Sequence, residues 1–189
     1  MLGHESSFRK RRQSRAIVIV HPETFPSVFF RAQHHDLLDL ADRVEITAIQ
    51  FLRFMGVIAN GGEAAEPYLM QKISRAGQTV YEAKTKTTGR LLSEETAKTL
   101  GDMMRGAVVN QYGAWQFGAL TVCAKSGTAE RENGPADAMF AGFVEDEAYP
   151  LAFVVFAERG GSGSQTAAPI AAKVLAACRT MLDTPNPNG

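Results

Sequence analysis

The spacing of apolar residues predicts regular structure from residue 44 onward. Between 44 and 58 apolar side chains lie nearly all round a helical projection, which predicts a helix buried between layers that stops at Asn60-Gly61-Gly62. Residues 71–85 alternate loosely between apolar and polar positions around a turn at Ala76-Gly77-Gln78. This second pattern predicts a β-hairpin.

A second helix is predicted after Ser93, because serine is a good N-cap and Glu94 and Glu95 follow it in the first turn. Its expected apolar face consists of Leu100, Met103, Met104, Ala107 and Val108. Residues 110–118 are expected to form a loop.

Three apolar runs, at 120–128, 139–144 and 151–157, are rich in β-branched and aromatic residues. A short acidic turn joins the last two, so the three runs predict an antiparallel meander. Residues 167–182 then repeat apolar side chains at helical spacing, and that helix is expected on one face of the sheet. The fold class predicted is therefore α+β, an antiparallel sheet with helices packed on its faces.

The first 43 residues differ in composition and receive no assigned structure. They open with a basic cluster around residues 9–15, followed by an apolar run at 16–20 that is interpreted as one strand at most. That run is too short for a signal peptide core or a membrane helix, so no targeting segment or anchor is predicted. The final segment, 183–189, holds two prolines and two asparagines and is expected to be a disordered tail.

Bulk composition argues against several classes of partner. Twenty basic and twenty acidic residues give a formal charge of zero, so nothing in the overall charge favours nucleic acid or an anionic membrane. Adjacent His34 and His35 would diverge by about 100° on a helix and are not expected to ligate a metal together. No cofactor is predicted, and Cys123 and Cys178 are interpreted as small buried hydrophobic residues.

The candidate chemistry lies at the end of the first predicted strand. There, Lys125, Ser126, Gly127 and Thr128 would place an ammonium group and two hydroxyls along one exposed edge. Gly127 has no side chain to block the approach of a ligand backbone. The run therefore predicts a polar strand edge that a ligand backbone can approach closely.

Lys125-Ser126-Gly127 is similar to the Lys-[Ser/Thr]-Gly motif of the penicillin-binding proteins and serine β-lactamases. Flanking stretches resemble the transpeptidase-only, high-molecular-weight class in the same order, from residue 44 to about 181. These stretches are Ile46-Thr47-Ala48-Ile49-Gln50, Ile58-Ala59-Asn60-Gly61-Gly62, Pro67-Tyr68, Phe140-Ala141-Gly142-Phe143 and Ala168-Pro169-Ile170. Residues 44–182 are thus expected to be the C-terminal part of such a transpeptidase domain, in a truncated or rearranged product.

The chain departs from the family pattern at several points. Ala48 replaces a usual proline, and Asn110-Gln111-Tyr112-Gly113 replaces a common Gly-Thr-Gly turn; neither is expected to touch the chemistry. The family's nucleophile is the serine of Ser-x-x-Lys, and Ser7 and Lys10 fit that pattern only by chance, because they lie in a cluster of like charges rather than an apolar helix. The second family motif, Ser-x-Asn, is missing from the sequence.

The resemblance implies roles for the four residues of the strand. Lys125 and Ser126 would bind the carboxylate of a peptidoglycan stem peptide or a β-lactam, Gly127 would leave the edge open, and Thr128 would give its N–H to an oxyanion hole. Without a convincing nucleophile, the chain is expected to be inactive alone. The family acts outside the cytoplasmic membrane in cell-wall synthesis and division.

Two alternatives remain open at this point. The chain could be a non-catalytic module that binds peptides or partner strands, or a nucleotide-binding module that uses the glycine-rich loop 160–164. A partial domain is also expected to expose core surface and to self-associate.

Overall fold

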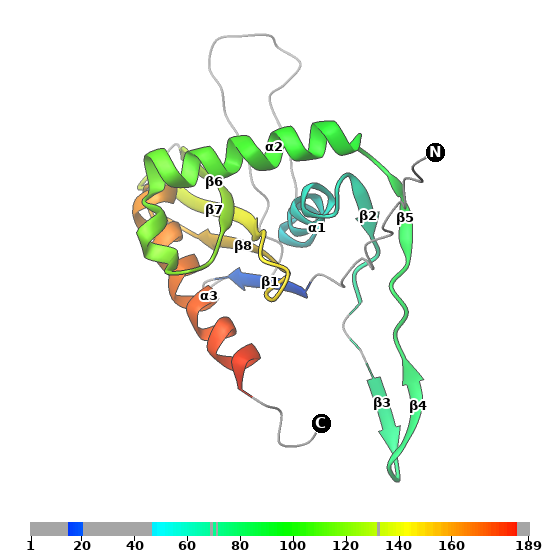
Figure 1. Cartoon of the computed structure of the whole chain (residues 1–189). Helices are drawn as coiled ribbons and strands as arrows, with labels where there is room; N and C mark the ends of the chain where they lie inside the picture. Colours follow the sequence, from blue (N-terminus) through cyan, green and yellow to red (C-terminus); the bar gives the residue numbers. More distant parts are fainter. Residues whose placement is uncertain (1–14, 21–46, 69, 71, 132, 185–189) are drawn as a thin grey trace, which may run out of the picture.

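The computed structural model describes residues 15–20, 47–68, 70, 72–131 and 133–184. Its central feature is a four-stranded sheet in the order β1-β8-β7-β6 (Figure 1). The strands are β1 (Arg15–Val20), β6 (Val122–Ala129), β7 (Asp137–Val144) and β8 (Leu151–Ala157). Strands β6, β7 and β8 form the predicted antiparallel meander, whereas β1 pairs with β8 in parallel. The pairing of β1 with β8 was not predicted, because the sequence of residues 15–20 does not indicate which strand lies beside them.

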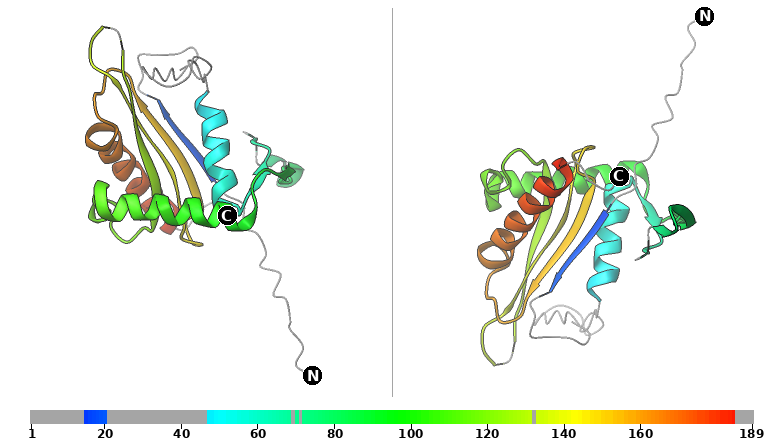
Figure 2. Two further views of the ribbon diagram at one scale, coloured as in Figure 1. Left: turned by 90° about the horizontal axis from the view of Figure 1, so that it is seen from above. Right: turned by 90° about the horizontal axis from the view of Figure 1, so that it is seen from below.

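Helices cover both faces of the sheet, so its inner strands are apolar on both sides (Figure 2). In β8, Phe153 and Val155 pack with α3 (Ala168–Asp183), and the alternating Val154 and Phe156 pack with α1 (Ala48–Ala59). This alternation follows from the two-residue period of a strand. The fold class predicted from the sequence is confirmed.

Helix α1 begins with a capping box. The Thr47 hydroxyl accepts a hydrogen bond from the Gln50 N–H at 3.2 Å, and the Gln50 side chain accepts one from the Thr47 N–H at 2.9 Å. Leu52 is buried against the sheet, but Ile49 and Phe54 are 58% and 41% exposed. The prediction of burial on all sides is therefore wrong for α1, because the described residues leave Ile49 and Phe54 uncovered.

Helix α2 (Glu94–Ala107) starts at the predicted cap, where the Ser93 hydroxyl accepts from the Thr96 N–H at 3.0 Å. The segment after it is not the loop that was predicted. It continues as a π-helical turn, η1 (Val108–Tyr112), and a 3₁₀ turn, η2 (Ala114–Phe117). This extension carries Tyr112 into the core, where it is only 7% exposed.

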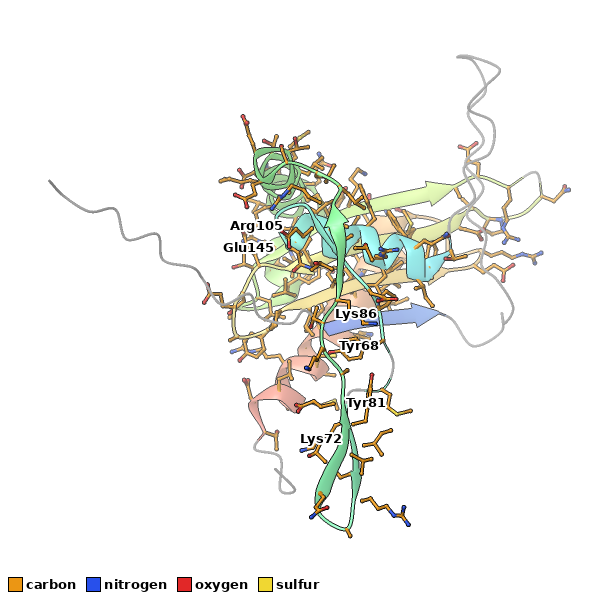
Figure 3. All side chains as sticks on the ribbon, turned by 90° about the vertical axis from the view of Figure 1, so that its right-hand side faces the viewer. Tyr68, Lys72, Tyr81, Lys86, Arg105 and Glu145 are labelled. Carbon is orange, nitrogen blue, oxygen red and sulfur yellow. The ribbon has the colours of Figure 1, made fainter. Side chains whose placement is uncertain are left out.

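An extended arm leaves the body beyond α1. Its base pairs β2 (Glu63–Ala65) with β5 (Thr87–Arg90), and its tip is the hairpin of β3 (Lys72–Arg75) and β4 (Gln78–Glu82). The predicted turn is present, with Ala76 and Gly77 both at positive φ. Figure 3 shows Tyr68, Lys72, Tyr81 and Lys86 along this arm, which stands beside the sheet in Figure 1. Among the described residues, no helix combines the length and apolarity needed to cross a bilayer.

Close packing of β7 on β6 gives a test of the fold. A Cβ added at Gly142 would lie 2.1 Å from the Cys123 carbonyl oxygen and 2.8 Å from the Ala124 Cα, so backbone would have to move. We expect Gly142→Ala to lower the free energy of unfolding by about 3 kcal/mol in urea titrations. Gly106→Ala is the matched control, because nothing lies within 4 Å of its added Cβ. The control should gain up to about 1 kcal/mol from helix propensity. Equal stability of the two variants would contradict this pairing of β6 with β7.

Candidate functional site

The candidate site lies on β6, the edge strand of the sheet. Neighbouring residues of an antiparallel strand point their N–H and C=O groups alternately toward and away from the paired strand. The Ser126 N–H donates to the Tyr112 hydroxyl and the Val122 carbonyl accepts from Arg105, so both of these residues direct their backbone away from β7. Thr128 has the same parity and also presents its N–H and C=O at the free edge.

Lys125 is exposed on this strand and folds back along it. Its Nζ donates to the Ser126 carbonyl oxygen at 2.7 Å and lies 5.9 Å from the centroid of the Tyr112 ring. A cation at this distance from an aromatic ring is weakly attracted to it. The ammonium group is therefore held near the edge and stays accessible to solvent.

Ser126 is hydrogen-bonded to Tyr112. The Tyr112 hydroxyl accepts from the Ser126 hydroxyl at 3.0 Å and from the Ser126 N–H at 3.3 Å. The expectation that the 110–113 departure leaves the chemistry untouched is therefore wrong. Its tyrosine contacts a residue of the Lys-Ser-Gly strand. The only signal in the sequence was an aromatic residue in a predicted loop, and that signal does not indicate a partner.

These contacts also change the acidity of the phenol. Burial raises the pKa of Tyr112, but the two Ser126 donors and the nearby Lys125 outweigh it, and the net effect lowers the pKa from its usual value. Hydrogen bonds and positive charge stabilise the phenolate form. The tyrosine and the strand are thus electrostatically coupled.

Gly127 and Thr128 are supported by the glycine-rich segment before α3, where the π-helical turn η3 (Gly163–Ala167) begins. The Gly163 N–H donates to the Thr128 hydroxyl at 3.3 Å. A Cβ at Gly163 would lie 2.3 Å from the Gly127 carbonyl oxygen and 2.4 Å from that of Met139, so only glycine allows this approach. The glycine-rich loop 160–164 therefore packs on the strand pair that carries the site.

Ion pairs hold the connection between β6 and β7 where it leaves β6 and enters β7. Arg131 contacts Asp137 at 2.8 Å and Glu158 at 2.9 Å, and the second Asp137 oxygen accepts from the Arg159 N–H at 2.8 Å. The Arg131 side chain is 33% exposed, so the pairs orient the connection more than they stabilise it.

Cys123 precedes Lys125 by two residues in β6 and packs on the α1 side of the sheet. Burial and the adjacent Glu145 carboxylate raise the pKa of its thiol to about 12. Figure 3 shows Glu145 together with Arg105, whose guanidinium donates to the Val122 carbonyl. Both cysteines are free thiols, and Cys123 is the small buried residue that was predicted, whereas Cys178 is only partly buried.

The other candidates from the sequence fall elsewhere. Ser7, Lys10, His34 and His35 lie outside the described residues. Within the part of the chain that the structure describes, no cluster of three histidine, cysteine, aspartate or glutamate side chains is arranged to hold a metal ion.

Comparison with known proteins identifies the family. The family profile described as penicillin binding protein transpeptidase domain matches residues 31–176. The chain therefore belongs to the penicillin-binding protein transpeptidase family. The match begins ahead of residue 44, where the recognisable motifs start.

Individual relatives agree with this assignment. The peptidoglycan D,D-transpeptidase PbpA of Mycolicibacterium smegmatis is 31% identical over 146 residues, covering 71% of this chain and 29% of the relative. The imipenem acyl-enzyme complex of penicillin-binding protein A from M. tuberculosis superimposes with a TM-score of 0.64 at 26% identity, covering 72% of this chain and 31% of that one.

The D,D-transpeptidase domain of a peptidoglycan glycosyltransferase from Eggerthella lenta gives a TM-score of 0.63 at 25% identity, covering 79% of this chain and 37% of that one. The chain thus spans about a third of the length of the relatives that it matches.

Proposed function

We propose that the free edge of β6 is a binding site for the carboxylate of a peptidoglycan stem peptide or a β-lactam. The observation that carries this proposal is the Lys125-Ser126-Gly127-Thr128 run on the edge strand of a penicillin-binding transpeptidase fold. Relatives with this fold form acyl-enzyme complexes with imipenem. The ligand class follows from that kinship and from the chemistry of the edge.

Lys125 and Ser126 form the anionic subsite. The ammonium group is exposed and provides a full positive charge, and the Ser126 hydroxyl, 3.0 Å from Tyr112, is a donor that can turn toward a carboxylate. Charge-assisted hydrogen bonds of this kind are about twice as strong as neutral ones. Lys125 therefore contributes most of the affinity.

Gly127 and Thr128 serve the backbone of the ligand. The outward N–H and C=O of Thr128 match the groups of an extended peptide that adds to the sheet edge. The same N–H supplies half of an oxyanion hole, and the other half would come from the N–H of a nucleophile.

This stretch of chain binds but does not turn over its ligand by itself. Ser7-Phe8-Arg9-Lys10 lies in a basic cluster, and no Ser-x-Asn accompanies it. Removing a covalent nucleophile typically costs several orders of magnitude in rate. The chain is therefore a non-catalytic, peptide-binding part of a transpeptidase. A nucleotide-binding role has less support, because the Gly163 N–H already donates to Thr128.

The anionic subsite is tested by removing the ammonium group. Lys125→Ala should weaken the non-covalent binding of penicillin G at least about tenfold in isothermal titration calorimetry, because a charge-assisted contact is lost. Lys173→Ala, on the exposed face of α3, is the matched control and should bind as the wild type does. Equal loss in both variants would show that the effect is general charge rather than this edge.

The absence of turnover has its own test. After incubation with a fluorescent penicillin and denaturing electrophoresis, we expect no labelled band, because no activated serine is available to form an ester. A PbpA-type transpeptidase serves as the positive control. A label that maps to Ser7, or to any other serine, would contradict the proposal of inactivity.

We also propose that the outer side of α1 associates with a second copy of the chain. Ile49 and Phe54 are 58% and 41% exposed there, which fits the exposed core surface expected of a partial domain. The double variant Ile49→Lys, Phe54→Lys should shift the protein to monomer in sedimentation velocity. Met103→Lys, at a residue 67% exposed on α2, is the control. A wild type that is a clean monomer with a sharp, reversible unfolding transition would contradict the proposal.

A further inference from the structure

The backbone around Tyr112 leaves its side chain little freedom. Gly113 has φ +82°, and a Cβ there would lie 2.7 Å from the Trp115 Nε1. The Gln116 side chain donates to the Tyr112 carbonyl oxygen at 2.5 Å, which ties η1 to η2. The Tyr112 ring packs edge-on against Phe140, with centroids 5.4 Å apart and planes at 82°. The phenol is thus fixed from both its backbone and its ring.

The Tyr112 hydroxyl acts as a hydrogen-bond acceptor in the structure. It accepts two hydrogen bonds, both from Ser126. Among the hydrogen bonds of the described residues, the phenol proton is not donated to any acceptor. A hydroxyl has one donor and two acceptor positions, so the proton of Tyr112 remains available to an acceptor that arrives with a ligand or moves next to it.

We propose that Tyr112 is a positioning residue that sets Ser126 for a bound carboxylate. In the free protein the Ser126 hydroxyl donates to Tyr112. When a carboxylate arrives, the Ser126 hydroxyl turns its proton to the ligand, and the Tyr112 hydroxyl donates to the Ser126 oxygen in return. This inference rests on the proposed carboxylate site and adds to it a residue outside the Lys-Ser-Gly strand.

The reversal is favourable because hydrogen bonds in a chain polarise one another. A serine that receives a hydrogen bond is a better donor to an anion than an isolated serine. The Ser126 N–H holds the phenol oxygen in place at 3.3 Å during the exchange, so no heavy atom has to move far. The hydroxyl protons of Ser126 and Tyr112 rotate, and no covalent bond is broken.

The arrangement makes binding depend on the protonation of the phenol. The charged group that acts on Tyr112 among the described residues is Lys125 from β6, and the packing partner Phe140 from β7 is neutral. Lys125 and the two Ser126 donors together lower the pKa of Tyr112. A phenolate has no proton to donate and repels an anion. Carboxylate affinity should therefore fall as the pH rises through this lowered pKa.

The direct test is Tyr112→Phe, which keeps the ring and removes the hydroxyl. We expect penicillin G to bind about five- to tenfold more weakly near neutral pH, the usual effect of one lost buried hydrogen bond. The alkaline loss of affinity expected of the wild type should move to higher pH in this variant. Tyr149→Phe is the control, because its hydroxyl donates to Asp183 on α3 and not to the β6 edge.

Two readouts need no ligand. Hydrogen exchange of the Ser126 amide should accelerate at least about tenfold in Tyr112→Phe, and that of Cys123, which pairs with β7, should not. Should Tyr112→Phe fail to fold, Ser126→Ala replaces it. Losing the serine donor should raise the pKa of Tyr112 in a tyrosinate absorbance titration.

The outcomes separate the two proposals. Binding that is lost in Lys125→Ala but unchanged in Tyr112→Phe would overturn the role of Tyr112 and leave the carboxylate site standing. A wild type that does not bind penicillin G would overturn the carboxylate site and, with it, the reversal of the hydrogen bond. The positioning contact itself would be refuted by an unchanged rate of Ser126 amide exchange in Tyr112→Phe. An unchanged pKa of Tyr112 in Ser126→Ala would refute it as well.

Discussion

The backbone pairing of β6 with β7 is the interaction on which the rest of the molecule depends. It fixes which groups of β6 face inward and which face the free edge, and thereby sets the direction of every group in the Lys125–Thr128 run. The same pairing leaves no room for a side chain at Gly142. The two apolar faces of β7 and β8 then draw α1 and α3 onto the sheet, because each face buries its own alternate residues.

Much of this arrangement could be predicted from local patterns. Ser93 as a cap, the turn at Ala76 and Gly77, and the three apolar runs all depend on short-range chemistry, and each is present in the structure. The partner of β1 could not be predicted, because pairing between segments so far apart in the sequence leaves no local trace. The exposed side of α1 was also missed, because an apolar residue such as Ile49 does not reveal whether a second layer will cover it.

The candidate site was predicted in part for a similar reason. Lys125, Ser126, Gly127 and Thr128 are consecutive, so one motif could indicate all four, and their proposed roles stay predictions. Tyr112 was missed because it reaches Ser126 through the π-helical turn after α2, and a one-residue change in that turn would rotate the phenol away. Spacing in sequence carries no information on such a contact. The contact is defined by the tertiary packing of η1, including that of the Tyr112 ring on Phe140.

The edge of β6 also illustrates how side chains protect most of an open strand. Arg105 covers the outward carbonyl of Val122, Lys125 covers that of Ser126, and Tyr112 covers the Ser126 N–H. Capping an edge with side chains prevents indiscriminate strand pairing. In the proposed site, a ligand strand would therefore meet uncapped backbone groups first at Thr128, whose hydroxyl accepts from the Gly163 N–H. In the proposed site, side-chain recognition at Lys125 and Ser126 and backbone recognition at Thr128 would thus be separated by the one residue, Gly127, that has no side chain to obstruct either.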